Sequence, residues 1–452
     1  MESFNRYLPI IENADGFLDS LQRPQPISFW CNPLKTSCKE TLAQLPKHIH
    51  PQPITWTQDA FKVPVWHRAG CTLAHQSGWY YLQEEIAMAA VAALAPQPGE
   101  QILDLCAAPG GKTGLIALRV GPTGTVVAND FNAQRQPQLS VNLSRLGLMN
   151  VLTSQADGRY WQLPAQRFDR VLVDVPCSGE GQIRKSRGKL WNRNFSQKIQ
   201  RVQTQLLAKA LSLVKPGGIV VYSTCTFAPE ENEAIINQTL GDQGYLEPVN
   251  IPALHADEGQ LHWRGNTFRS DLIHARRYWP HMNDTGGFFL ARIRRRNETM
   301  AESTCKISHK LQKLRSHPCL EWLIQRFGLP PHTFDQHCLW DKGQQKLWLS
   351  DFTDIPPGIV PQVIGLPVAQ YQSRGFKPTT AFLQRFGPLI SRNWIDLPTA
   401  DMAVKFMQGH PQTYQGRIDH GFVHVRYGPY HLGCGLCGNG MLYSQIPKSL
   451  RL

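Results

Sequence analysis

The stretch DLCAAPGGKT at residues 104–113 decides the fold of this chain. It begins inside an apolar run, Ile102–Leu105, and passes through a turn of small residues into the helical pattern of residues 115–118. This order predicts a strand, a glycine turn and a helix. In such a turn the backbone can approach a ligand closely, and the amides of the helix N-terminus face that ligand. Asp104 is expected at the carboxyl end of the strand, where open α/β sheets bind ligands.

Four interpretations of this turn compete. A phosphate-binding P-loop requires glycine five positions before Gly-Lys-Thr, and Cys106 occupies that position. A dinucleotide fingerprint requires Gly-x-Gly-x-x-Gly, and the turn offers only the adjacent Gly110 and Gly111. The turn therefore fits S-adenosylmethionine (SAM), which carries no phosphate, or it joins a strand to a helix and binds nothing. For a lone glycine pair the last interpretation is the better one, but two cysteine motifs downstream favour SAM.

Strand and helix patterns alternate from about residue 100 to residue 296, which predicts a parallel, doubly wound α/β sheet. One helix is predicted over 197–214, and another over 80–96, where Pro96 ends it. A last strand is predicted over 286–296. The other predicted strands are Gln101–Leu105, Thr125–Asn129, Val151–Ser154, Asp169–Val173 and Gly218–Ser223.

Acidic residues follow three of these strands. Asp130 closes VVAND, Asp157 lies just beyond VLTSQAD, and Asp174 closes RVLVD. One carboxylate at a strand end is a common polar group of loops, but three on the ligand-binding edge indicate a row of binding residues. Asp130 follows the second strand and is placed to accept hydrogen bonds from ribose hydroxyls.

Composition favours an anionic macromolecule as partner. The 452 residues carry a formal charge of +13, and 42% of them are hydrophobic. This length predicts two or three domains, and the positive charge favours nucleic acid over a membrane, although it also serves solubility alone. No apolar stretch is long enough to span a membrane, and the N-terminus lacks the hydrophobic region of a signal peptide. Eleven scattered cysteines suit reduced thiols and a cytoplasmic location.

The chain divides into four predicted parts. Residues 1–80 carry short aromatic and β-branched runs, which predict a small α/β or mostly β unit. Residues 81–296 hold the sheet, and residues 297–305 read as a linker. Residues 306–452 mix short aromatic strands with turns and end in a glycine-rich, basic and aromatic segment. Such a segment suits contacts with phosphates and bases, against the alternative of a β-barrel with solvated charges.

Two cysteines lie directly after predicted strands. Cys177 lies in DVPCSGEG at 174–181, and Cys225 lies in YSTCTFAPEENE at 222–233. Each alone is more typical of a buried structural thiol. Together, at the ligand edge and beside a glycine turn, they indicate catalytic thiols. Arg184 and Lys185 are candidates for the positive charge that makes a thiolate accessible near Cys177.

A pair of thiols beside a SAM site suits methylation of cytosine at C5. That carbon is too weakly nucleophilic to attack a methyl donor, and a thiolate that adds at C6 activates it. An acid near N3 stabilises the adduct, and a base removes the C5 proton so that the thiol can leave. Asp174 and Cys177 are available for these tasks.

The three motifs together resemble the RsmB/RsmF family of SAM-dependent RNA cytosine-5 methyltransferases. CAAPGGK matches the cofactor loop of that family, DVPCSGEG its first cysteine motif and YSTCT its second. Arg277–His281 and Gly287–Phe289 match its RxxPH and GFF elements. The resemblance extends through ISFWCNPLK and YYLQEE near the N-terminus. It continues into a C-terminal half that resembles a PUA-like RNA-binding region, where 373–378 matches its glycine-proline spacing.

The resemblance implies a Rossmann-like methyltransferase domain, an N-terminal RNA-binding unit and roles for individual residues. Cys225 is implied as the nucleophile and Cys177 as the residue that assists release of the methylated base. Asp130 is implied to hold the ribose of SAM and Asp157 its adenine, with Asp174 between cofactor and cytosine. The residues implied to bind SAM are Cys106, Ala107, Ala108, Pro109, Gly110, Gly111, Lys112, Asp130, Asp157 and Asp174.

The implied substrate is ribosomal RNA, 16S RNA in particular, for a monomeric, cytoplasmic enzyme without a metal ion. A transfer-RNA methyltransferase is the alternative within the class. An RNA-binding or ribosome-assembly factor without turnover is the alternative of another class, and the intact Cys177, Cys225 and cofactor motif argue against it.

Two departures from the family pattern bear on substrate choice. Trp30-Cys31-Asn32 stands where the family often has Arg-Val-Asn, so an N-terminal contact differs. Ser186–Lys189 replaces the usual acidic and proline residues after Arg184-Lys185, which makes this loop more basic.

A second cysteine pair lies near the C-terminus. Cys434 and Cys437 form C-x-x-C, with His431 upstream. A structural zinc site usually needs two such pairs, and the tail holds one. The sequence therefore predicts a turn with two structural thiols and no metal ion.

Overall fold

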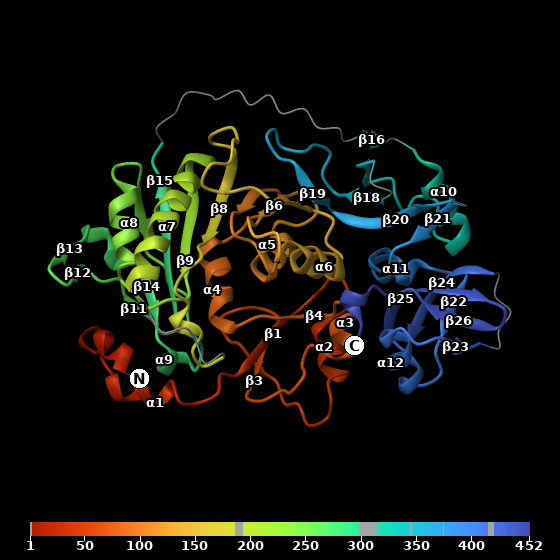
Figure 1. Cartoon of the computed structure of the whole chain (residues 1–452), viewed down its shortest axis with the longest axis horizontal. Helices are drawn as coiled ribbons and strands as arrows, with labels where there is room; N and C mark the ends of the chain where they lie inside the picture. Colours follow the sequence, from red (N-terminus) through yellow and green to blue (C-terminus); the bar gives the residue numbers. More distant parts are fainter. Residues whose placement is uncertain are drawn as a thin grey trace.

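The computed structural model in Figure 1 shows one large sheet with a smaller β-rich unit at its N-terminal and at its C-terminal side. The central sheet has ten strands, in the order β11-β14-β15-β9-β8-β5-β6-β7-β19, and β10 pairs with β15. The structure describes residues 2–185, 193–297, 312–314, 316–343, 346–373, 375–414 and 420–452.

The core of the central sheet is parallel. Strands β9, β8, β5, β6 and β7 run side by side in one direction. Strand β15 extends the sheet antiparallel to β9, and β14 pairs antiparallel with β15. The elements from this region are α4 (Glu85–Leu94), β5 (Gln101–Asp104), α5 (Gly111–Val120), β6 (Thr125–Asn129), α6 (Gln136–Leu146), β7 (Val151–Ser154), β8 (Phe168–Asp174), η2 (Glu180–Gln182), α7 (Arg193–Leu213), β9 (Val214–Thr224), α8 (Glu233–Leu240), β10 (Gly244–Glu247), β11 (Asp257–Glu258), β12 (His262–Trp263), β13 (Asn266–Thr267), η3 (Ser270–His274), β14 (Arg276–Tyr278), α9 (Pro280–Asn283) and β15 (Phe288–Arg295).

Two hydrophobic clusters cover the two faces of this sheet. Helices α4, α5 and α6 pack on one face, and α7 and α8 pack on the other. The central strands read as nearly continuous apolar runs because parallel strands buried on both faces carry no polar side. The predicted fold class, a Rossmann-like α/β sheet with a small α/β unit before it and a β-rich region after it, is confirmed.

The N-terminal unit contains an antiparallel sheet in the order β2-β3-β1-β4, drawn in red and orange below the central sheet in Figure 1. Its last strand leads directly into α4, so the unit is joined to the central sheet without a spacer. Its elements are η1 (Glu2–Ile10), α1 (Ala14–Ser20), β1 (Ile27–Cys31), α2 (Cys38–Ala43), β2 (Gln52–Pro53), β3 (Ala60–Val63), α3 (Leu73–Gln76) and β4 (Tyr80–Leu82).

The C-terminal region holds two five-stranded sheets, β16-β17-β18-β20-β21 and β22-β24-β25-β26-β23. Helix α11 packs between them, against β20 and β25. The elements are β16 (Gln312–Leu314), α10 (Pro318–Phe327), β17 (Cys338–Asp341), β18 (Lys346–Ser350), β19 (Pro361–Ile364), β20 (Leu366–Gln372), β21 (Gly375–Pro378), α11 (Thr380–Phe386), η4 (Gly387–Leu389), β22 (Trp394–Asp396), α12 (Ala400–Gln408), β23 (Gln412–Thr413), β24 (Gly421–Tyr427), β25 (Tyr430–Gly438), β26 (Met441–Ser444) and η5 (Lys448–Leu450).

One strand of the C-terminal region belongs to the central sheet. Strand β19 pairs antiparallel with β7 and forms the edge of that sheet. The backbone N–H of Val363 donates to the Thr153 hydroxyl at 3.1 Å, and that of Gly365 donates to the Val151 carbonyl at 2.7 Å. This pairing was not predicted from the sequence. Strand β19 covers the outer edge of β7, whose backbone groups would otherwise be unpaired and exposed.

The predicted elements match the observed ones apart from shifts at their ends, and two of these shifts change the type of element. The helix predicted over 80–96 is wrong at its start, because Tyr80–Leu82 forms β4 and pairs with β1 before α4 begins at Glu85. Strand β9 begins at Val214, where a helix end was predicted, because α7 passes directly into it. In the described part of the chain no helix is long and apolar enough to cross a membrane. Most of the predicted linker, Ser186–Lys189 and Arg374 lie outside the described residues.

Candidate active site

The glycine turn joins β5 to α5 as predicted. Gly110 has φ of +105°, a left-handed conformation that residues with a Cβ rarely adopt, and it forms the N-cap of α5. A Cβ on Gly111 would lie 2.7 Å from Tyr81 of the N-terminal unit, so the close approach at this glycine is to that unit. The turn therefore fixes the start of α5 and seats the N-terminal unit against it.

A cavity of about 290 Å³ opens beside this turn, at the carboxyl ends of β5 and β6. Cys106, Asp130 and Asp157 line it, so the structure brings these three predicted residues together. Phe131 also lines it, and this side chain is 64% exposed. Phe131 was not predicted as a site residue, although it directly follows Asp130, the predicted ribose-binding residue. An exposed ring at the mouth of such a cavity offers a surface for a planar base.

The two cavity carboxylates are held differently. Asp130 is buried, accepts the backbone N–H groups of Ala108 at 3.0 Å and Asn132 at 2.9 Å, and lies 3.5 Å from Arg135. Asp157 is paired with Arg159 at 2.6 Å, and hydrogen bonds from Arg159 lower the pKa of this carboxyl. Asp130 is thus held by backbone N–H groups of the turn and of the next loop, whereas Asp157 is held by the guanidinium of Arg159.

The two predicted catalytic thiols meet. Cys177 follows β8, Cys225 follows β9, and their sulfur atoms are 3.3 Å apart. Both side chains are half-buried. The contact with Cys225, together with burial, raises the pKa of the Cys177 thiol well above its usual range. Cys177 therefore keeps its proton more firmly than an exposed cysteine does.

Asp174 and Lys112 form an ion pair near Cys225. The Lys112 ammonium lies 2.6 Å from Asp174 Oδ2, and the Ser223 hydroxyl donates to Asp174 Oδ1 at 2.7 Å. Burial alone would lower the pKa of Lys112, but Asp174, Asp104 and Cys225 raise it overall. Lys112 is thus a cation that neighbours both Asp174 and Cys225.

Several carboxylates converge on the inner end of the turn. Burial, then the charges of Asp104, Asp130 and Asp174, raise the pKa of Cys106 well above its usual range. Asp104 is 1% exposed and accepts the Thr113 hydroxyl at 2.7 Å through Oδ2. Burial raises the pKa of Asp104 to about 7. Its Oδ1 atom has no hydrogen-bond partner among the described residues.

This environment fits SAM. The cofactor carries a cationic sulfonium and an ammonium group, and a buried carboxylate oxygen without a partner is suited to such a cation. Asp104 and the row of Asp130, Asp157 and Asp174 supply acceptors, while the adjoining cavity holds the exposed Phe131. Asp104 was predicted at this edge but not among the cofactor residues.

A buried polar network holds both cysteine loops. Glu231 accepts the backbone N–H of Ser178 at 2.9 Å, and the hydroxyls of Ser178 and Thr226 are 2.7 Å apart. Glu180 accepts the hydroxyls of Tyr7 at 2.6 Å and Thr226 at 2.9 Å. The loops of Cys177 and Cys225 are thus tied to each other and to the first helix of the chain. Four of these five residues lie within the two quoted cysteine motifs, and that position was the available signal.

Arg277, from the predicted RxxPH element, supports the second cysteine loop. It is 2% exposed, donates to Glu233 Oε1 at 2.6 Å and to the Phe227 carbonyl at 2.9 Å. Phe227 lies two residues after Cys225, so the hydrogen bond from Arg277 to its carbonyl anchors that loop directly. The motif therefore has a structural basis in the placement of the second cysteine.

Other sequence-selected residues lie elsewhere. Arg184 does not act at Cys177, because its buried guanidinium binds the Thr285 carbonyl at 2.8 Å and Asp284 at 2.6 Å. Trp30 is buried, stacks on Tyr81 and donates to Gln83 at 2.8 Å, so this departure from the family is an internal packing contact. Six of the predicted cofactor residues belong to the turn and the start of α5 but do not line the cavity: Ala107, Ala108, Pro109, Gly110, Gly111 and Lys112.

The second cysteine pair does not lie in a turn, which corrects that prediction. Cys434 and Cys437 are both buried within strand β25. They join different hydrophobic clusters. Across the described ranges no group of three or more histidine, cysteine, aspartate or glutamate side chains is arranged to hold a metal ion.

Comparisons with known proteins agree with this geometry. The family model described as 16S rRNA methyltransferase RsmB/F matches residues 91–294, and the N-terminal domain of 16S rRNA methyltransferase RsmF matches residues 1–85. A family of unknown function matches residues 296–360. The ribosomal RNA small subunit methyltransferase F of Aeromonas hydrophila is 30% identical over 98% of this chain and 94% of its own length. This chain belongs to the RsmB/F family.

Further relatives and a solved structure match about two thirds of this chain. The Escherichia coli (strain ED1a) ribosomal RNA small subunit methyltransferase F is 36% identical over 66% of this chain and 63% of its own length. The Schizosaccharomyces pombe protein named 25S rRNA (cytosine-C(5))-methyltransferase nop2 is 36% identical over 63% and 48%. A solved methyltransferase homologue from Pyrococcus horikoshii is 32% identical, with a TM-score of 0.57, over 64% of this chain and 93% of that chain. Family membership confirms the resemblance, and with it SAM as the predicted cofactor.

Proposed function

We propose that this RsmB/F member is an enzyme that transfers a methyl group from SAM to C5 of a cytosine in ribosomal RNA, with 16S RNA as the substrate. The observation that carries the proposal is the 3.3 Å approach of Cys177 and Cys225 beside the Lys112–Asp174 pair. Relatives named for small-subunit ribosomal RNA over nearly the full chain support this substrate over transfer RNA.

Each residue of the site has a task in this reaction. The Cys225 thiolate, which neighbours the Lys112 cation, adds to C6 of the cytosine and makes C5 nucleophilic. When bound, SAM supplies the methyl group that C5 accepts. Asp174, fixed by Lys112 and Ser223, stabilises the adduct from the cytosine side. A base then removes the C5 proton, the C6–sulfur bond breaks, and the protonated Cys177 assists the departure of Cys225.

The cytosine must leave its stack to reach this site. The thiols lie in a half-buried position at the sheet edge, so a base held between them and the cofactor has to be unpaired or flipped out. The N-terminal unit and the PUA-like C-terminal region are proposed to hold the flanking RNA. We further propose that the enzyme acts as a cytoplasmic monomer and uses no metal ion.

Two measurements test the proposal. Bisulfite sequencing of total RNA from cells with and without the gene should show one or more cytosines in 16S RNA that lose their protection. SAM should raise the melting temperature of the purified protein, because a ligand that binds only the folded state stabilises it, whereas ATP and NAD should not. Loss of protection in transfer RNA alone would move the substrate to that class. A protein that binds SAM and RNA but never transfers the methyl group would be an assembly factor instead.

A further inference from the structure

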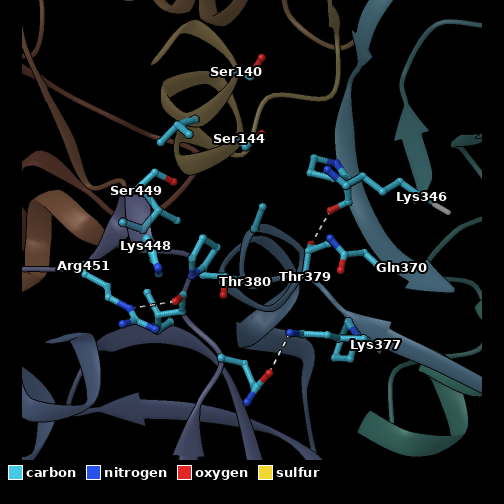
Figure 2. Close-up of a pocket in the computed structure, with 18 of the residues that line it drawn as sticks. Ser140, Ser144, Lys346, Gln370, Lys377, Thr379, Thr380, Lys448, Ser449 and Arg451 are labelled. Atoms are coloured by element: carbon cyan, nitrogen blue, oxygen red, sulfur yellow. Dashed lines mark hydrogen bonds between the residues drawn. The ribbon is translucent and has the colours of Figure 1, made fainter. Parts of the chain in front are cut away.

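A groove of about 520 Å³ runs between helix α6 of the central unit and the C-terminal region (Figure 2). One wall is α6, which presents Ser140 and Ser144 one turn apart. The opposite wall comes from β18, β20 and β21, and the floor comes from the start of α11 and the last residues of the chain, 444–451. Three segments that are far apart in the sequence thus enclose one surface.

All charged side chains that line this groove are positive. Lys346, Lys377, Lys448 and Arg451 line it, and no acidic residue does so among the described ones. Lys346 and Lys448 are exposed. Lys377 donates to the Gln445 side chain at 2.8 Å, and Arg451 donates to the Ile446 carbonyl at 3.3 Å, so both contacts are to neutral groups. Four cations without an anionic partner in the lining leave a local field that attracts an anion.

The groove also carries polar and apolar groups that suit a nucleotide. The Thr380 side chain lies at its floor, is 3% exposed, and its hydroxyl oxygen has no hydrogen-bond partner in the described part of the chain. Ser140 and Ser144 of α6 also line the groove (Figure 2). Trp348, Val363 and Ile446 add apolar surface. Hydroxyl donors, lysines and an apolar wall together are typical of sites for single-stranded nucleic acid.

We propose that this groove binds the phosphate backbone of a single-stranded segment of the substrate RNA. The inference rests on the proposed function, because the same RNA would be held here and at the thiols. Helix α6 borders both the cofactor cavity and the groove: Arg135, which precedes its first residue, lines the cavity, and Ser140 and Ser144 line the groove. At 1.5 Å per residue, residues 135 and 140 are about 8 Å apart along the axis, so RNA held in the groove lies against the unit that carries the cofactor cavity.

This location assigns part of the RNA contact to the junction between units. Neither α6 nor the C-terminal region alone forms the groove, since each supplies one wall. The β19–β7 pairing fixes the two walls relative to each other. The groove is therefore a preformed site, and RNA binding there does not have to order the junction.

The test uses the full chain and the double variant Lys346→Gln/Lys448→Gln. Both side chains are exposed, so the variant should keep the wild-type melting temperature. Binding of a fluorescein-labelled oligouridylate of about twelve nucleotides is measured by anisotropy at several salt concentrations. Each lost phosphate contact lowers the salt slope by about 0.7 for a single strand, so the slope should fall by about 1.4 and affinity at about 0.1 M salt by at least tenfold.

The matched control is Arg264→Gln/Arg296→Gln, which removes two exposed cations on the β12–β13 hairpin and after β15. An unchanged slope in the groove variant, or an equal fall in the control, overturns the proposal.

Methylation of small ribosomal subunits from cells that lack the gene provides a second readout, in which the groove variant should raise KM and leave kcat unchanged. If the groove variant binds oligouridylate normally but loses recognition of subunits, the groove binds a ribosomal protein instead, and the proposal is wrong. Wild-type protein that binds oligouridylate through the groove but methylates nothing would refute the proposed function and not the groove.

Discussion

Two cysteine pairs in this chain show opposite relations between spacing in the sequence and distance in space. Cys177 and Cys225 are 48 residues apart, and their sulfur atoms approach to 3.3 Å. Cys434 and Cys437 are separated by two residues, yet they lie in different hydrophobic clusters. The reason is geometric, because residues three apart on a strand point to opposite faces, whereas adjacent parallel strands end at one edge. Only the first pair can act on one substrate.

The surroundings of the two pairs differ as well. Cys177 and Cys225 are half-buried beside Lys112, Asp174 and a network of buried carboxylates. Burial raises the pKa of Cys434 to about 12, although Lys377 lies near enough to lower it, and burial also raises the pKa of Cys437. Burial thus outweighs a nearby cation at the second pair. These thiols serve packing and remain protonated.

The largest expected difference between the pairs is in turnover. Cys225→Ala should lower methyl transfer by at least roughly a thousandfold, because it removes the nucleophile. Transfer of radioactive methyl groups from SAM to 16S RNA measures it. Cys437→Ala is the matched control and should keep the wild-type rate per folded molecule. Equal rates for wild type and Cys225→Ala would show that Cys225 is not the nucleophile and that the first pair has no catalytic role that the second lacks.

Cys177→Ala should separate the two members of the first pair. With its assistant lost, Cys225 should remain attached to C6 of the methylated base, and a denaturing gel should show a slow-migrating protein–RNA band. The double variant with Cys225→Ala should lack this band. Accumulation of the band in Cys225→Ala alone would reverse the two roles. A wild type that methylates RNA while neither variant traps it would argue against a covalent route.

The carboxylates beside the first pair should make SAM binding depend on pH. Asp104 has a pKa of about 7, and its ionised form attracts a cation, so affinity should rise about tenfold between pH 6 and pH 8. The stability of the protein without SAM should depend on pH with the opposite sign. The pKa of Asp104 in the folded protein exceeds its unfolded value of about 3.9, so the free energy of unfolding should fall as pH rises from about 4 through 7. Calorimetric titration measures the affinity, and Asp104→Asn should flatten its dependence on pH. A profile that keeps its slope in that variant assigns the titration to another group.

The smallest effect is expected at the second pair. Cys434→Ala should cost about 1 to 2 kcal/mol of unfolding free energy, because it leaves a small cavity in a buried cluster. Urea denaturation measures this change, and methylation per folded molecule should stay at the wild-type value. A loss of turnover without a loss of stability would give this strand a role in catalysis.

The parts of the fold that the sequence predicted are those with a local signal. Strands β5, β6 and β7 appeared as apolar runs because both of their faces are buried, and the cysteine motifs directly followed strands. The meeting of Cys177 and Cys225 then followed from the edge that parallel strands share. A parallel sheet therefore makes a site of this kind visible in the sequence.

What was missed depends on partners far along the chain. Tyr80–Leu82 became a strand because it pairs with Phe29–Cys31, about fifty residues earlier. Tyr7 reaches Glu180 across 173 residues, and no local pattern marks that contact. Arg184 looked like a charge for Cys177, but three backbone carbonyls and Asp284 take its guanidinium. Long-range hydrogen bonds, rather than propensity, decide these positions.

The pairing of β19 with β7 has a consequence for the newly made chain. Strand β7 ends at residue 154, and its neighbour on the outer side begins at residue 361, 361 − 154 = 207 residues later. At a ribosomal rate of 5 to 20 residues per second, that neighbour emerges about 10 to 40 s after β7. During this interval the central sheet has an open edge next to apolar residues, a state that recruits foreign strands. A nascent chain stalled between these two strands should therefore depend on chaperones more than the released full-length chain does.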